Sequence, residues 1–151
     1  MDIDESAYRD ARKSVNPHPC AFEKALLARC CQCGLAQRMN IAEREAVGCT
    51  DPALRETCVA LRGHLRQNSA FALKLQHTGG PLPHAKELKI QCGGLRGLQK
   101  VLSGSAEVEN VNDVGALARL ALERYLTLEQ LPYSAIIQAV AAYEIRRRRT
   151  P

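Results

Sequence analysis

Apolar side chains recur at helical spacing through much of the chain. Within residues 52–76, for example, Leu54, Cys58, Leu61 and Leu65 fall on one helix face. No stretch shows the alternation of apolar and polar residues that is typical of a half-buried β-strand. The chain is therefore predicted to be all-α, a single-domain bundle of five or six helices.

Proline, glycine and capping residues divide the chain into separate predicted helices. Thr50 or Asp51 is a candidate N-cap, as is Asn112 or Asp113, because short polar side chains accept hydrogen bonds from the free N–H groups of a first helical turn. The predicted helices cover residues 19 to about 47, 50 to about 76, 83–102, 113–126 and 132–148, with a short helical turn from Leu128.

The chain divides into a polar lead-in, residues 1–18, and one helical domain, residues 19–151, with an Arg-rich C-terminal end. The two prolines of "NPHP" disfavour helix before them. A length of 151 residues suits one domain with a hydrophobic core.

The first residues are charged, and no run of about 18 apolar residues follows, so we expect neither a secretory signal nor a membrane contact. We therefore predict a cytoplasmic protein. Disulfide frameworks are uncommon in that reducing compartment, and the 7 cysteines cannot all pair within the chain. Metal ligation, thiol chemistry, and cysteine as a small core residue remain as explanations.

Three of the cysteines, Cys30, Cys31 and Cys33, lie within four positions. Cys33, Cys49 and Cys92 each have a glycine neighbour, which allows close approach of a backbone N–H to a cluster sulfur. We predict that Cys33, Cys49 and Cys92 ligate an inorganic centre. The fourth ligand would be Cys31 or Cys30.

Four cysteine ligands suit either an iron–sulfur cluster or structural zinc. The cysteines are dispersed along the chain, whereas zinc ribbons and fingers prefer two tight CxxC pairs, so the pattern favours a 4Fe–4S cluster over zinc. Gly93, Gly94 and Gly97 would weaken the helix predicted for residues 83–102. Either a bulky inorganic group packs against this bare backbone, or another helix approaches closely.

Two further cysteines were weighed as ligands. Cys20 follows Pro19 in a first helical turn, where its pKa should be lowered, making it reactive or a ligand. A continuous helix would nevertheless place it about 20 Å from Cys33, outside a shared cluster. Cys58 belongs to an apolar stripe and is predicted to be a core residue rather than a ligand.

These features predict a small iron–sulfur protein that acts in electron transfer, redox sensing or support of a metalloenzyme. One alternative is a metal-free thiol redox switch, in which Cys20, Cys30 or Cys31 pairs reversibly. Another is a zinc-stabilised helical adaptor whose arginines at 146–149 bind an acidic partner.

The net charge of +5 is modest, and the chain has only two Phe, four Tyr and no Trp. Nucleic-acid binding is therefore weakly supported, because base-stacking platforms are lacking. We expect a protein partner instead.

Overall fold

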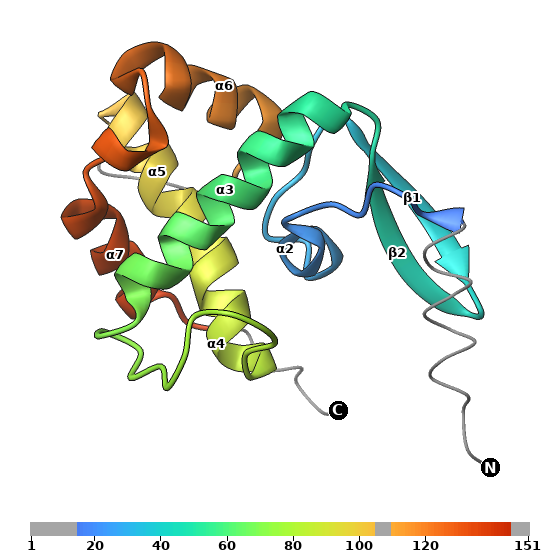
Figure 1. Ribbon diagram of the computed structural model, residues 1–151, viewed down its shortest axis with the longest axis horizontal. Helices are drawn as coiled ribbons and strands as arrows, with labels where there is room; N and C mark the ends of the chain where they lie inside the picture. Colours follow the sequence, from blue (N-terminus) through green and yellow to red (C-terminus); the bar gives the residue numbers. More distant parts are fainter. Residues whose placement is uncertain (1–14, 105–109, 146–151) are drawn as a thin grey trace.

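The computed structural model describes residues 15–104 and 110–145, which fold into helices and one two-stranded antiparallel sheet (Figure 1). The protein is therefore mixed α and β, and the prediction of an all-α bundle is wrong. The sheet lies within residues 36–49, most of which belong to the helix predicted for residues 19 to about 47. The Arg-rich end at 146–149 and the first part of the lead-in, residues 1–14, lie outside the described residues.

The hairpin consists of β1, Ala36–Ile41, and β2, Arg44–Cys49. Its turn residues, Ala42 and Glu43, both have positive φ, 50° and 69°. Two positive φ values characterise the turn whose twist matches a β-hairpin, and Asn-Gly or Asp-Gly usually supplies them. Because Ala and Glu occupy the turn here, and because good helix formers surround it, the strongest sequence signal for a hairpin is missing.

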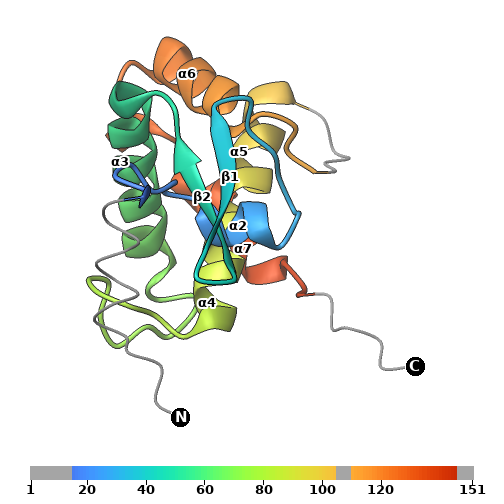
Figure 2. The same ribbon diagram turned by 90° about the vertical axis from the view of Figure 1, so that its right-hand side faces the viewer.

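The first helix is much shorter than predicted. It is α2, Glu23–Leu27, and Arg29 after it has φ of 62°, a left-handed conformation that ends helices. The following segment turns away and pairs Cys31 with Val111 in an isolated parallel bridge. The chain then enters the hairpin, which projects from one end of the molecule in Figure 1 and faces the viewer in Figure 2.

The remaining helices lie near their predicted ranges, but two end early, at Ser69 rather than about residue 76 and at Ala142 rather than about residue 148. Two of them are capped as expected: the Asp51 side chain accepts from the Leu54 N–H (3.2 Å), and the Asp113 side chain accepts from the Ala116 N–H (3.3 Å). They are α3, Pro52–Ser69; α4, His84–Leu88; a π-helical turn η1, Lys89–Gly93; α5, Gly94–Ser103; α6, Val114–Tyr125; a 3-10 turn η2, Leu128–Gln130; and α7, Tyr133–Ala142.

The glycines around Cys92 serve close helix packing. A Cβ at Gly93 would lie 2.7 Å from Val140 Cα, and one at Gly97 would lie 2.7 Å from the Ile136 carbonyl oxygen, both in α7. At Gly94 a Cβ would meet the side chain of Leu65 at 2.8 Å. Of the two explanations for these glycines, the structure shows the approach of neighbouring helices.

Candidate functional site

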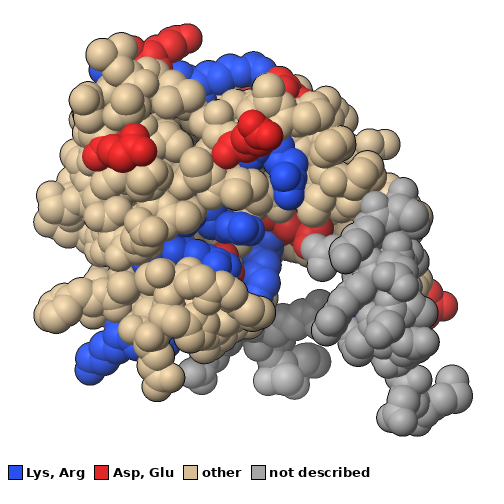
Figure 3. Space-filling view, viewed as in Figure 1, with Lys and Arg blue, Asp and Glu red and all other residues tan. Residues whose placement is uncertain are grey.

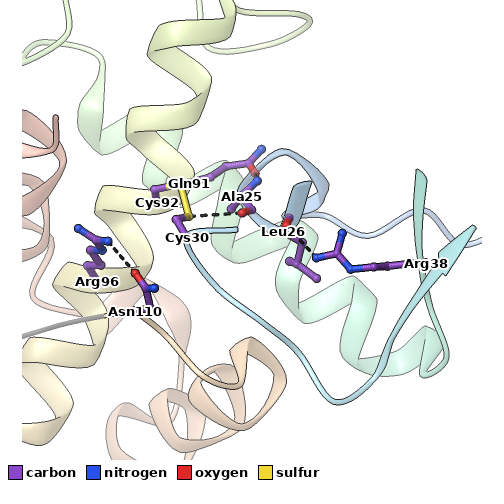
Figure 4. Close-up of a disulfide and its surroundings, with 8 residues drawn as sticks. All are labelled: Ala25, Leu26, Cys30, Arg38, Gln91, Cys92, Arg96 and Asn110. Carbon is purple, nitrogen blue, oxygen red and sulfur yellow. Dashed lines mark hydrogen bonds between the residues drawn. A yellow bond between two sulfur atoms is a disulfide. The ribbon is translucent and has the colours of Figure 1, made fainter. Parts of the chain in front are cut away.

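Cys30 and Cys92 form a disulfide with a Cα–Cα distance of 6.0 Å (Figure 4). The bond joins the loop after α2 to the π-turn η1, and both residues are buried. Neither sulfur is a free thiolate in this state, so neither can act as a ligand in it. The structure therefore does not bring Cys92 together with Cys33 and Cys49, and its role as a ligand stays a prediction for a reduced state.

Four other cysteines line one small cavity: Cys20, Cys33, Cys49 and Cys58. They come from different parts of the chain, namely the turn before α2, the loop after it, the end of β2, and α3. The surface of the cavity is apolar. Its other lining residues are Ala21, Phe22, Leu35, Ala36, Gly48, Leu54, Arg55, Val114 and Gly115.

The early end of α2 explains why Cys20 can share this cavity with Cys33. A continuous helix would separate the two, but α2 ends at Leu27 and Arg29 has a left-handed conformation between them. Backbone hydrogen bonds then hold Cys20 beside β2: its N–H donates to the Val47 carbonyl at 2.9 Å. Cys20 is thus a cavity residue that sequence reasoning set aside.

Cys58 belongs to the apolar stripe of α3, as predicted, and is buried. Burial, with smaller contributions from Cys20, Cys33 and Cys49, raises its pKa to about 12. An apolar stripe could not distinguish a core position from a ligand position, because the cavity lies within the core.

Backbone N–H groups point at two of the cavity sulfurs. The backbone N–H of Phe22 lowers the pKa of Cys20, and those of Leu35 and Gly115 lower the pKa of Cys33, because each stabilises the thiolate form. Gly115 lies in the first turn of α6, where N–H groups have no partner within the helix. The glycine that matters for Cys33 is therefore Gly115, rather than its sequence neighbour.

Burial is the largest influence on the pKa values of Cys20, Cys33 and Cys58. It raises the pKa of Cys20 to about 11, where the sequence argument had expected a lowered value. Burial also raises the pKa of Cys33, and Asp113 adds to that effect. The Cys49 thiol donates to the Asp51 carbonyl at 3.3 Å. In this state Cys20, Cys33 and Cys58 are neutral at pH 7, so a bound metal would have to displace their protons.

Cys31 lies near this group without lining the cavity. It is buried, and burial raises its pKa to about 12, with Cys20 and Cys33 contributing. Its backbone is fixed by the bridge to Val111. The structure therefore brings Cys31 close to two cavity cysteines but gives it a separate environment.

The cavity is small for an inorganic guest. Its volume is about 20 Å³, roughly the space of one water molecule. Within residues 15–104 and 110–145, no group of three or more His, Cys, Asp and Glu side chains is already placed to hold a single metal ion. A guest larger than one atom would have to move the cysteine-bearing segments outward.

Comparison with protein-family models, curated proteins and solved structures found no match. In the part of the chain that the structure describes, no helix combines the length and apolar character needed to cross a bilayer. What can be said of function therefore depends on the geometry of the cysteines and of the charged side chains around them.

Proposed function

We propose that Cys20, Cys33, Cys49 and Cys58 ligate an iron–sulfur cluster, of the 4Fe–4S type, in a protein of electron transfer, redox sensing or metalloenzyme support. The observation that carries this proposal is the convergence of four cysteines from separate segments on one apolar cavity. Four thiolates are the usual ligand set of such clusters. The proposed set keeps two residues of the sequence prediction, Cys33 and Cys49.

The hydrogen bonds to the sulfurs favour a ligand role over simple core packing. A backbone N–H stabilises a thiolate more than a thiol, and metal-bound cysteine sulfurs accept such bonds. Cys20 and Cys33 both receive them. A cysteine that acts only as a small apolar residue has no need of these donors.

A cluster and a zinc ion differ in the sulfur spacing that they require. Tetrahedral zinc, with Zn–S bonds of about 2.3 Å, requires sulfurs roughly 3.8 Å apart. No described group of side chains meets the requirement for a single ion. A cluster lies between its ligands and takes more widely separated sulfurs, so it requires less convergence than zinc does. The cysteine-bearing segments would have to move outward to admit it, because the cavity has a volume of only about 20 Å³.

A cluster bound here would supply one-electron chemistry. The apolar residues Phe22 and Leu54 would exclude water from it, and the N–H groups aimed at Cys20 and Cys33 would raise its reduction potential. The half-buried cation Arg55 on the same cavity wall would act in the same direction. A protein partner that exchanges the electron, and a cytoplasmic location, belong to this proposal.

The test is reconstitution of the full chain with ferrous iron and sulfide under anaerobic conditions. We expect about four irons and four sulfides per chain, visible absorption, and an EPR signal after reduction with dithionite. Cys20→Ser and Cys58→Ser should each lower the iron content severalfold, whereas Cys31→Ala, a buried neighbour outside the cavity, should retain it. Circular dichroism checks that each variant folds.

Other outcomes would contradict the cluster. Zinc bound at about one per chain without sulfide would identify a structural zinc site. Folded protein that takes up neither iron nor zinc would identify the four cysteines as core residues. Loss of iron in Cys31→Ala alone would move the site to the neighbouring segment.

The disulfide favours a second candidate, a thiol switch formed by Cys30 and Cys92. Cys30, Arg29 and Arg96 line a cleft of about 310 Å³. Through this cleft a small thiol can reach the Cys30 sulfur. In the reduced form the Cys30 thiol could donate to the Ala25 carbonyl oxygen, 3.4 Å from its sulfur (Figure 4). Both redox states would then be accommodated.

Reduction of this disulfide consumes two electrons and two protons, which two molecules of glutathione supply as they form glutathione disulfide. The test is alkylation of protein equilibrated in glutathione buffers, followed by peptide mass mapping. A midpoint within the cytoplasmic range supports a switch. A bond that stays intact throughout that range is a fixed cross-link.

A further inference from the structure

A second cleft, of about 310 Å³, adjoins the cysteine cavity, and Cys20 lines both. Its walls come from α2, from α3 and from the loop that contains Pro81 and Leu82. This volume is at the lower end of the range for small-molecule sites. The cleft is thus large enough for a compact ligand next to the proposed centre.

Four cations line this cleft: Lys24, Arg55, Arg62 and Arg66. The three arginines share one face of α3, because their separations of 7 and 4 residues are close to whole helical turns. Figure 3 shows Lys and Arg side chains gathered along a hollow on this side of the molecule. The arrangement concentrates positive charge at a concave surface.

One of the four cations is already neutralised. Arg66 donates to Glu87, with N–O distances of 3.0 and 2.9 Å, and the Glu87 side chain is only 3% exposed. Gln91 donates to the other Glu87 oxygen at 2.8 Å. This buried network forms a fixed part of the cleft wall. A second carboxylate, Glu23, also lines the cleft and accepts from the Val47 N–H at 2.9 Å, so the four cations still outnumber the two carboxylates there.

Arg55 and Arg62 are held by neutral partners. Arg55 Nε donates to the Pro19 carbonyl at 2.6 Å, and an Arg62 NH group donates to the Ala21 carbonyl at 3.0 Å. Each bond orients a guanidinium group without cancelling its charge. Burial and the neighbouring cation Arg66 lower the pKa of Arg62, so an anion in the cleft would relieve an unfavourable concentration of charge.

We propose that this cleft binds a small oxyanion, a carboxylate or phosphate group, through Arg55, Arg62 and Lys24. Guanidinium groups bind both kinds of group with paired hydrogen bonds, and their orientation here is fixed in advance. The site is independent of the cluster: it requires only the arginines of α3. Where a cluster is present, the anion lies beside its ligand Cys20, as a substrate or effector of that centre would.

The test is titration calorimetry of the full chain at low ionic strength with inorganic phosphate and, separately, with succinate. We expect saturable binding of at least one of them, and the stronger probe identifies the preferred group. Arg62→Gln should weaken binding about tenfold, because a charge-assisted hydrogen bond is lost. Lys100→Gln, which removes the same charge at the exposed end of α5, should change it less than about twofold.

Arg62→Lys keeps the positive charge but removes the paired N–H donors of the guanidinium group, so it should weaken anion binding by a factor between those of the parent and Arg62→Gln. Because this change is conservative, it also controls for a folding defect in Arg62→Gln. Titrations of metal-free and reconstituted protein separate this site from the proposed cluster. Absence of saturation by either anion would overturn the proposal. Equal losses in Arg62→Gln and Lys100→Gln would do the same, because they would indicate unspecific charge attraction.

Discussion

Pro19 lies opposite Gly48 in an isolated antiparallel bridge, and this pairing places Cys20 and Cys49 on the same side of the two segments. Two hydrogen bonds frame it: the Cys20 N–H donates to the Val47 carbonyl at 2.9 Å, and the Cys49 N–H donates to the His18 carbonyl at 2.7 Å. The cavity cysteines therefore depend on a contact between residues about 30 positions apart, which no local motif records.

Removing the disulfide should destabilise the fold. It closes a loop with a sequence separation of 62, and a cross-link of that length is expected to contribute about 2–4 kcal/mol. We expect the double variant Cys30→Ala, Cys92→Ala to lose that amount in urea unfolding. The parent protein should lose a comparable amount in reductant, and the variant should not respond to reductant at all. A response of the variant would show that another cysteine pair contributes.

The buried pair of Arg66 and Glu87 should matter more than an exposed pair of similar geometry. Glu87→Gln leaves a half-buried guanidinium without its counter-charge and should cost about 3 kcal/mol of unfolding free energy. The matched control is Glu45→Gln, whose partner Arg38 lies at 2.7 Å on the surface of the hairpin. It should cost less than about 1 kcal/mol. Equal effects would mean that solvent reaches the buried pair.

Substitution of two helical glycines should have opposite effects. A Cβ at Gly93 would lie 2.7 Å from the backbone of α7, so Gly93→Ala should destabilise the fold by about 1–3 kcal/mol through overpacking. At Gly63, in α3, a Cβ would meet nothing within 4 Å, and alanine should stabilise the helix by up to about 1 kcal/mol. Urea unfolding of both variants measures the difference. If Gly93→Ala were neutral, close packing would not explain the glycines around Cys92.

The sequence predicts those structural features that depend only on residues adjacent in the chain. Asp51 and Asp113 were each one of two neighbouring cap candidates, and the sequence could indicate them because a cap acts within one helical turn. The hairpin was missed because Ala42 and Glu43 adopt a conformation that their residue types rarely take. Neither residue gives a turn signal, so a helix was the natural interpretation.

The candidate site was only partly predictable for a related reason. Cys33 and Cys49 were chosen for their neighbouring glycines, yet a Cβ at Gly48 would instead meet Asn16, 2.6 Å away. The grouping of Cys20 with them depends on the early end of α2 and on pairing with β2, both of which are tertiary effects. A disulfide between residues 62 positions apart leaves no spacing signal either.

The stability of the metal-free protein should fall at alkaline pH. Burial raises the pKa of Cys58 from 9.0 to about 12 and that of Cys20 to about 11. Above pH 9 the unfolded chain loses these protons while the folded chain keeps them, so the unfolded state is favoured increasingly as pH rises. Stability should be constant with respect to these thiols below pH 9 and decrease between pH 9 and about 12, the folded-state pKa of Cys58. Urea midpoints across this range measure the decrease. Cys58→Ala should reduce its slope, and an unchanged slope would show that Cys58 is not buried as a neutral thiol.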